Sequence, residues 1–218
     1  MIKPQILYED NHLIVALKPA GVLSQSDNTN GEDMLTILKA YLKEKYDKKG
    51  NVYLGLVHRL DRPVAGVMVF AKTSKAASRL SEQIRTGIMH KYYYAVIEGH
   101  LKDKEGTLND RIEKISNEKV LLNTVNGKEA SLNYKVVSEY NNYSLLDIEL
   151  LTGRYHQIRL QFSSRGYPLY GDKKYGSKIS CSDIALFAYK LVFNHPITKE
   201  AIVFTAEPTL DIFKKFKK

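Results

Sequence analysis

Residues 58–72 read HRLDRPVAGVMVFAK, and this stretch decides both the expected fold and its candidate site. Asp61 lies between Arg59 and Arg62 and is followed by a wholly apolar run over 64–71, which is typical of a buried strand. Flanking guanidinium groups favour the ionised form of a carboxylate, and such a carboxylate at a strand end can act as a nucleophile or a base. The same residues also fit an ion pair that only stabilises a turn, so both interpretations stay open.

The segments on either side alternate between short apolar runs and a few stretches with helical spacing. Helices are predicted over 34–46, after a cap at Thr73 or Ser74, and from 153–154 to about Gly166. We expect strands in a hairpin within 6–21 and then over 52–57, 64–71, 92–97, 107–115, 118–123, 129–139, 143–151, 184–193 and 200–205. Clustered strands with few helices predict an α+β fold with a mixed, mostly antiparallel sheet in a single domain over 1–218.

A second charged segment, LLTGRYHQIRLQFSSRGYPLYGDKKYG, occupies residues 150–176. Gly153 permits a sharp strand-to-helix turn, so Arg154 is expected at the start of the helix, with Arg159 further along it. Arginine makes bidentate contacts with carboxylates and phosphates, and Arg154 therefore fits a contact with Asp61 or with an RNA phosphate. A surface arginine without a partner is the alternative.

A third segment, HKYYYAVIEGH over 90–100, places adjacent tyrosines on one strand. Alternate residues of a strand face opposite sides, so Tyr93 is separated from Tyr92 and Tyr94. We expect core packing for Tyr92 and Tyr94. An aromatic ring beside a basic cleft can also stack on a nucleobase, but the alternation prevents all the tyrosines from doing so together.

Composition favours a polyanionic partner and a reducing compartment. The 33 Lys and Arg exceed the 24 Asp and Glu and give a formal net charge of +9, which attracts nucleic acid, although a basic enzyme without such a partner has the same excess. The single cysteine, Cys181, permits no intrachain disulfide and no cysteine-based zinc site. No leader peptide, bilayer-spanning run or histidine metal motif is apparent, so we expect a cytoplasmic protein without metal or other cofactor.

Taken together, the three segments resemble the RluA family of pseudouridine synthases, which act on large-subunit ribosomal and transfer RNA. The family pattern H-R-L-D-x-x-(T/S)-S-G, followed by an apolar strand and Ala-Lys, is matched by residues 58–72. The pattern Y-x-A-x-(V/I)-x-G is matched by YYAVIEG at 93–99. TGRYHQIR at 152–159, GYPLYGDKKYG at 166–176 and an opening DNHLIVALKPAG at 10–21 match the remaining patterns.

The resemblance implies roles for individual residues. Asp61 matches the catalytic aspartate, and Tyr93 matches the tyrosine that stacks on the target base and helps as a general base late in the reaction. Arg154 matches the arginine that pairs with the catalytic carboxylate. Arg59 matches an arginine that in some members fills the gap left by a flipped nucleotide, and Leu186 matches an apolar position beneath the uracil. The expected RNA- or base-binding set is His58, Arg59, Arg62, Arg159 and Leu186.

The resemblance also implies a pseudouridine-synthase domain with a central RNA-binding cleft flanked by helices and loops. The expected partner is ribosomal or transfer RNA, and we expect a monomer that needs no cofactor, membrane or protein partner. For His58 and His156 we expect packing or a contact with the RNA backbone rather than proton transfer.

The resemblance covers roughly residues 8–205, with departures at a few positions. Val64 and Ala65 replace a pair of hydroxyl residues, and Gln161 replaces a histidine that many members have. These changes concern loop detail and substrate choice rather than the reaction. The small N-terminal RNA-binding domain of many relatives is also not expected, because the opening hairpin begins almost at Met1.

Two other classes of protein share some of these features. A non-catalytic RNA-binding protein of the same fold would have the basic charge but would not need Asp61, Tyr93 and Arg154 together. A hydrolase acting on a small glycoside would need a second carboxylate beside the bond, and Asp172 is the nearest candidate by motif. Its G-D-x-x-Y-G setting instead predicts a turn.

Overall fold

A computed structural model describes residues 2–27, 31–116, 119–181 and 183–216. The chain forms two compact units: the first consists of Met1–His90 and Ala188–Glu207, and the second of Lys91–Phe187 and Pro208–Lys218. The chain passes from one unit to the other at the start of β5 (His90–Glu98), within β10 (Leu186–Asn194) and again between Glu207 and Pro208. The expectation of a single domain stays a prediction.

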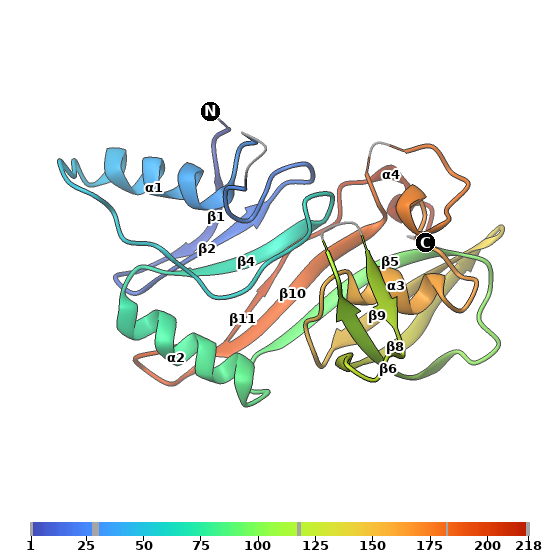
Figure 1. The fold of residues 1–218 in the computed structure, drawn as a ribbon. Coiled ribbons are helices and arrows are strands. Elements are labelled where there is room, and N and C mark those ends of the chain that lie inside the picture. The colour runs from blue at the N-terminus through green and yellow to red at the C-terminus, as the bar shows by residue number, and fades with distance from the viewer. Residues whose placement is uncertain (1, 28–30, 117–118, 182, 217–218) are drawn as a thin grey trace. The chain divides into compact units, whose positions relative to one another are not determined.

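The first unit combines a sheet with two helices (Figure 1). Its strands follow the order β1-β2-β4-β10, with β3 paired to β4 and β11 paired to β10. The elements are β1 (Gln5–Glu9), β2 (Leu13–Lys18), α1 (Met34–Lys45), β3 (Gly55–Leu56), β4 (Ala65–Ala71), α2 (Ser74–Arg85), the later part of β10, and β11 (Ala201–Thr205).

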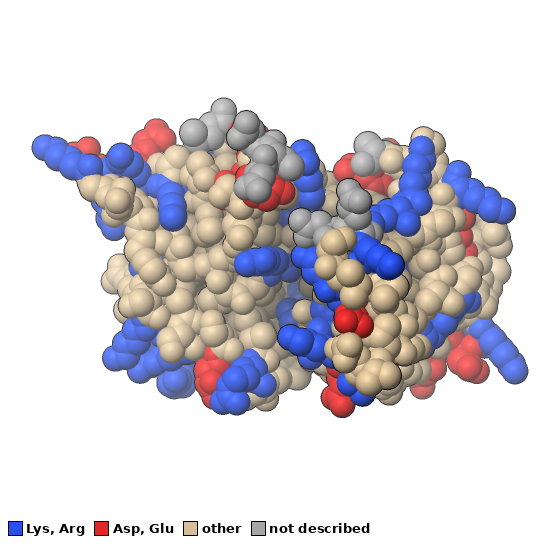
Figure 2. Space-filling view, viewed as in Figure 1, with Lys and Arg blue, Asp and Glu red and all other residues tan. Residues whose placement is uncertain are grey.

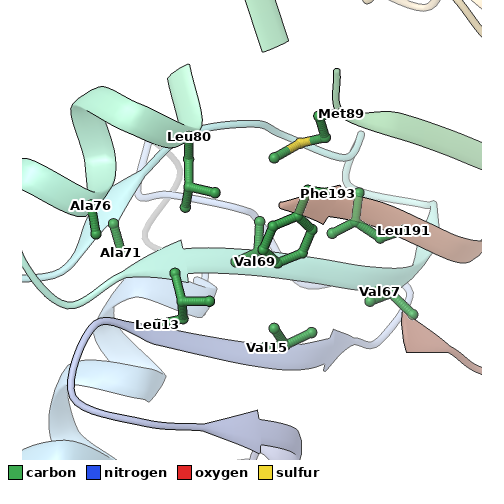
Figure 3. Close-up of a cluster of buried hydrophobic side chains, with 10 residues drawn as sticks. All are labelled: Leu13, Val15, Val67, Val69, Ala71, Ala76, Leu80, Met89, Leu191 and Phe193. Atoms are coloured by element: carbon green, nitrogen blue, oxygen red, sulfur yellow. The ribbon is translucent and has the colours of Figure 1, made fainter. Parts of the chain in front are cut away.

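The core of the first unit lies between α2 and one face of this sheet (Figure 3). Alternate residues of neighbouring strands point into it, as the strand period of two requires. Its members are Leu13, Val15, Val67, Val69, Ala71, Ala76, Leu80, Met89, Leu191 and Phe193. An added Cβ at Gly66 would lie 2.5 Å from the carbonyl oxygen of Ala188, so β4 and β10 approach closely only because this position is glycine.

Most predicted elements of the first unit are confirmed. The hairpin is present as antiparallel β1 and β2, α1 begins after an Asp33 cap, and Thr73 caps α2 by accepting from the Ala76 amide. The strand predicted over 52–57 is much shorter, because β3 pairs only with the last two residues of β4, whose edges are otherwise taken up by β2 and β10.

The second unit has a sheet in the order β5-β9-β8-β6-β7. Neighbouring strands in it pair antiparallel. The elements besides β5 are β6 (Glu105–Lys114), β7 (Val120–Leu122), β8 (Lys128–Tyr140), β9 (Tyr143–Leu150), α3 (Gln157–Ser163), a 3₁₀ turn (Lys173–Tyr175) and α4 (Asp211–Lys214). On α3, Phe162 is fully buried and meets the Tyr134 ring edge to face at 5.7 Å.

The α+β fold with a mostly antiparallel sheet is therefore confirmed. Position 118 of the strand predicted over 118–123 lies outside the described residues, and the part that is described forms β7. None of the helices in the described ranges is both long and apolar enough to cross a lipid bilayer.

Glu9 joins β1 to α1 and to the end of β4 through a dense set of hydrogen bonds. Its carboxylate accepts from Lys45 at 2.7 Å, Lys72 at 2.9 Å, Tyr46 at 2.7 Å and Tyr41 at 3.0 Å. Burial alone would raise the pKa of Glu9, but these donors hold it at about 2, well below 4.5.

We expect this cluster to make stability depend on pH. A carboxyl group with a depressed pKa stabilises the fold above its unfolded pKa, so the contribution is complete at neutral pH and disappears as the pH falls from 4.5 to about 2. It corresponds to on the order of 3 kcal/mol at most. Urea unfolding of Glu9→Gln should show lower stability than the parent at pH 7 and a smaller difference near pH 3. The exposed Glu44→Gln is the control, and equal pH dependence in Glu9→Gln and the parent would contradict the expectation.

Candidate active site

The peptide that carries Asp61 is held on one side by a buried serine. Ser24, 5% exposed, accepts from the amide of Leu60 at 3.0 Å and donates to the carbonyl oxygen of the same residue at 2.8 Å. A turn follows, in which the Val64 amide donates to the Asp61 carbonyl at 3.0 Å. The backbone on both sides of the carboxylate is therefore fixed by hydrogen bonds.

A fully buried lysine holds the other side of the Asp61 peptide. Lys18 Nζ donates to the carbonyl oxygens of Pro19 at 3.0 Å, Val22 at 2.6 Å and Arg62 at 3.1 Å. The Arg62 carbonyl also accepts from the Gly21 amide at 2.9 Å, while Arg62 Nε donates back to the Gly21 carbonyl at 3.0 Å. Gly21 has φ +81°, a left-handed conformation that glycine adopts without strain. We call Lys18, Ser24 and Gly21, with the backbone of Leu60 and the backbone and Nε of Arg62, the Asp61 clamp.

The motif side chains of the first unit differ in their accessibility. Arg59 is exposed, whereas His58 is half-buried and its Nε2 accepts from the Val69 amide at 3.1 Å. Arg62 is exposed but its Nε belongs to the clamp. Val64, 2% exposed, replaces a hydroxyl residue of the family pattern with a buried apolar contact. Arg59 is thus the motif side chain of this loop best placed to reach a ligand.

In the second unit Tyr93 lies on β5 opposite Ile148 of β9 and is 6% exposed. Tyr92 and Tyr94 are half-buried, so the expectation that these two fill the core was wrong. The Tyr92 hydroxyl instead donates to Glu149 at 3.3 Å on the opposite face of the sheet. The strand alternation was correct, but along Tyr92–Tyr94 the side of β5 that carries Tyr93 is the more buried one.

Arg154 lies in an irregular loop ahead of α3 rather than at the start of the helix. The buried Gln157 side chain accepts from the Arg154 amide at 3.0 Å and from the Thr152 hydroxyl at 2.9 Å. His156 adopts φ 52°, and α3 begins only after it. The predicted helix start was therefore too early, because the Gln157 side chain stabilises a turn at this point. Arg154 Nε donates to the Glu129 carbonyl at 2.7 Å.

Lys91 is a candidate that the sequence analysis missed. It precedes Tyr93 by two positions on β5, so both side chains start from the same face of the strand. An added Cβ at Gly153 would lie 3.5 Å from Lys91 Nζ. Burial, and next the positive charge of Arg154, lower the pKa of Lys91. Strand alternation applied to HKY would have grouped Lys91 with Tyr93.

Arg159 does not occupy an RNA-facing position. Its side chain is 5% exposed and binds Asp172 through Nε at 2.7 Å and Nη2 at 2.8 Å. The expectation of an RNA contact was wrong for Arg159, because the paired carboxylate satisfies the guanidinium inside the second unit. Leu186 begins β10 and is 5% exposed, and its contact with the uracil stays a prediction.

Two further polar residues of the second unit, His156 and Gln161, make contacts within the protein. His156 Nδ1 lies 2.8 Å from the Tyr175 hydroxyl, and burial together with nearby cations, Arg159 foremost, lowers the pKa of His156 to about 3. It is therefore neutral at physiological pH. The amide of Gln161 donates to Asp110 at 2.7 Å, so this departure from the family pattern serves a buried contact. Among the residues described, no group of His, Cys, Asp and Glu is arranged to hold a metal ion.

The site residues thus form two local sets, one in each unit. The first presents a clamped carboxylate, Asp61, beside an exposed arginine, and the second presents a buried tyrosine with Arg154 and Lys91. Taken by itself, the first set suits chemistry that uses a fixed carboxylate, and the basic groups of the second set suit an anionic substrate.

Comparisons with known proteins identify the family. The model of the RNA pseudouridylate synthase family matches residues 12–164. The chain is 37% identical to the uncharacterized RNA pseudouridine synthase YhcT of Bacillus subtilis, over 91% of this chain and 66% of that protein. It is 33% identical to the dual-specificity RNA pseudouridine synthase RluA of Haemophilus influenzae, over 93% of this chain and 92% of that protein. The chain belongs to the RNA pseudouridylate synthase family, in its RluA branch.

Two other similarities agree. Ribosomal large subunit pseudouridine synthase D of Nitrosomonas europaea is 35% identical over 88% of this chain, which spans 58% of that protein's length. The human RNA Pseudouridylate Synthase Domain Containing 4 structure superposes with a TM-score of 0.81 at 22% identity, over 97% of this chain and 91% of that one. At this identity the superposition shows the fold.

Ser24→Ala should impair catalysis more than folding. The substitution leaves the buried amide and carbonyl of Leu60 without the hydroxyl, at a cost of about 1–3 kcal/mol. Because the Leu60 peptide positions Asp61, we expect kcat to fall on the order of tenfold or more while the protein stays folded. Steady-state kinetics and thermal unfolding measure the two effects. The matched control is Ser81→Ala on the exposed face of α2, and wild-type kcat in Ser24→Ala would argue against the clamp.

Proposed function

We propose that this chain is an RNA pseudouridine synthase that converts uridines of ribosomal or transfer RNA to pseudouridine. The single observation that carries the proposal is the clamp that holds the Asp61 peptide, because a reacting carboxylate needs a fixed position. The names of the relatives, which include a dual-specificity enzyme and a large-subunit enzyme, support an RNA substrate of this kind.

The proposed reaction is an isomerisation. The bond from ribose C1′ to uracil N1 breaks, a bond from C1′ to C5 forms, the proton on C5 is lost to solvent, and N1 gains a proton. Atoms and electrons balance without an oxidant or reductant. Asp61 acts at C1′ or removes a sugar proton in the first step, and both routes need the ionised carboxylate.

The other motif residues receive the roles that their positions imply. Tyr93 stacks on the detached uracil and removes the C5 proton late in the reaction. Arg154 stabilises the charge of the catalytic carboxylate. Arg59 occupies the gap left by the flipped uridine, and its exposure supports this role. Unstacking a base costs a few kcal/mol, which such an insertion offsets in part.

The proposal extends to the setting of the enzyme. A net charge of +9 supports direct binding to RNA by this chain. The proposal also takes the chain to act as a monomer without a protein partner. A single cysteine supports a reducing compartment such as the cytoplasm.

The glycoside hydrolase alternative finds little support. It requires a second carboxylate beside the scissile bond, and the motif candidate Asp172 is 1% exposed and paired with Arg159. A non-catalytic RNA-binding protein of the same fold stays as the second candidate, and substitution of Asp61 separates it from the enzyme.

Asp61→Asn should abolish product formation but leave folding and RNA binding intact. The amide keeps the shape of the side chain and removes the charge, so we expect activity to fall at least about 100-fold. Release of tritium from transfer and ribosomal RNA transcripts labelled at uridine C5 measures turnover. Asp47→Asn, at an exposed position with φ 46° that asparagine tolerates, is the matched control. Turnover by Asp61→Asn at the parental rate would refute the mechanism. If the parent enzyme itself turned over none of the transcripts, the proposed function would be refuted.

Tyr93→Phe should separate stacking from proton transfer. The ring remains, so RNA affinity should change less than about threefold, whereas loss of the hydroxyl should slow product formation by on the order of 100-fold. Filter binding and tritium release measure the two quantities. Tyr92→Phe changes the neighbouring tyrosine, whose hydroxyl contacts Glu149, and should keep near-parental activity. Full activity in Tyr93→Phe would restrict this residue to stacking.

A further inference from the structure

A cavity of about 330 Å³ lies in the second unit, at the place where β6 ends and β8 begins. Its wall includes Lys114 from β6, Lys128 from β8, Asn126 from the turn between β7 and β8, and the loop residues Arg154 and Tyr155. The volume is at the lower end of the range for small-ligand sites. We call it the β6–β8 cavity.

Positive charge dominates this cavity. Lys114, Lys128 and Arg154 all line it and are all exposed, so their cationic groups can reach a ligand. The carboxylate in the wall belongs to Glu113, which accepts from the Thr124 hydroxyl at 2.7 Å. Lys91 adds a further cation beside Gly153. Figure 2 shows Lys and Arg side chains on the face of the second unit where Figure 1 draws β6.

Two of these cations are held in place by the protein. Arg154 Nε donates to the Glu129 carbonyl at 2.7 Å, and Lys114 Nζ lies 4.3 Å from the centre of the Tyr155 ring. The Tyr155 ring in turn stacks on His156, with centroids 3.8 Å apart. Fixed cations lose less conformational entropy when an anion binds than exposed lysines without such contacts.

The surroundings favour a phosphate over a nucleobase. His156 and Lys114 already occupy the Tyr155 ring, so it offers little surface on which a base could stack. The guanidinium of Arg154, two ammonium groups and the amide of Asn126 are instead donors that suit phosphate oxygens. Like charges gathered around one cavity repel each other, and an anion relieves that repulsion.

We propose that the β6–β8 cavity binds a backbone phosphate of the RNA substrate, through Lys114 and Lys128. The inference rests on the proposed function for the identity of the polyanion. It adds a place at which the strand is held: the two lysines provide affinity without touching the reacting base, and Arg154 keeps the role proposed for it above.

The test measures how RNA binding depends on salt. An oligouridylate of about 20 nucleotides with a fluorescent label is titrated with the whole chain at several NaCl concentrations, and binding is followed by anisotropy. Each lost contact with a single-stranded phosphate should reduce the slope of log K against log salt by about 0.7. Because the cavity holds one phosphate, we expect a partial reduction in Lys114→Gln and in Lys128→Gln, and a reduction of about 0.7 in the double variant. The control Lys102→Gln removes one exposed charge just before the start of β6, whereas the cavity lies at the end of this strand. It should leave the slope unchanged.

A second arm uses inorganic phosphate, followed through the amide NMR signals of Gly153 and Arg154. Phosphate should shift these signals saturably in the parent and not in the double variant. Equal slopes for Lys102→Gln and the cavity variants, or phosphate shifts that persist in the double variant, would overturn the proposal. Phosphate shifts with an unchanged oligouridylate slope would assign the cavity to free phosphate and also overturn it. Both arms measure binding, so they stay informative if no transcript is turned over and the proposed function fails.

Discussion

The ammonium group of Lys18 is fully buried and donates to three backbone carbonyls, one of which belongs to Arg62, next to Asp61. A buried cation is stable only when dipoles or charges replace its lost hydration, so those carbonyls must stay close to it. This requirement fixes the loop after β2 against the loop before β4. Ser24 adds a second fixed point at Leu60. The position of Asp61 thus depends on residues about 40 positions earlier in the chain.

In the second unit the charged motif side chains are also held in place, but by different contacts. Arg154 is held by the Glu129 carbonyl and by the turn that the Gln157 side chain stabilises, while Arg159 is neutralised by Asp172. Two arginines five positions apart therefore have different surroundings. Arg159 is buried in a structural ion pair, whereas Arg154 stays exposed with its charge available. The difference depends on whether a carboxylate is packed beside the guanidinium, and not on the local sequence pattern.

Local patterns predicted most of the fold. The hairpin of β1 and β2, the capped helices α1 and α2 and the buried strand β4 each have a periodicity and an end signal in their own residues. The start of α3 and the fate of Arg159 were mispredicted because both depend on tertiary partners, the buried Gln157 side chain and Asp172. The role of Lys18 was missed because lysines are seldom fully buried, and Lys91 was missed although its alternation with Tyr93 was visible.

Charge and geometry contribute differently to recognition of a long polyanion. A net charge of +9 attracts RNA of any sequence without selecting a position on the strand. A position on the strand is selected only where the cation is held by the protein, because a bound phosphate must then take up the place that the cation fixes. Lys114, whose ammonium group lies over the Tyr155 ring, meets this condition. A strand held there has a fixed register relative to Tyr93 and Lys91, because all of these residues belong to the second unit. Which uridine is offered for reaction then depends on this register, while the bulk charge determines how often the RNA is encountered.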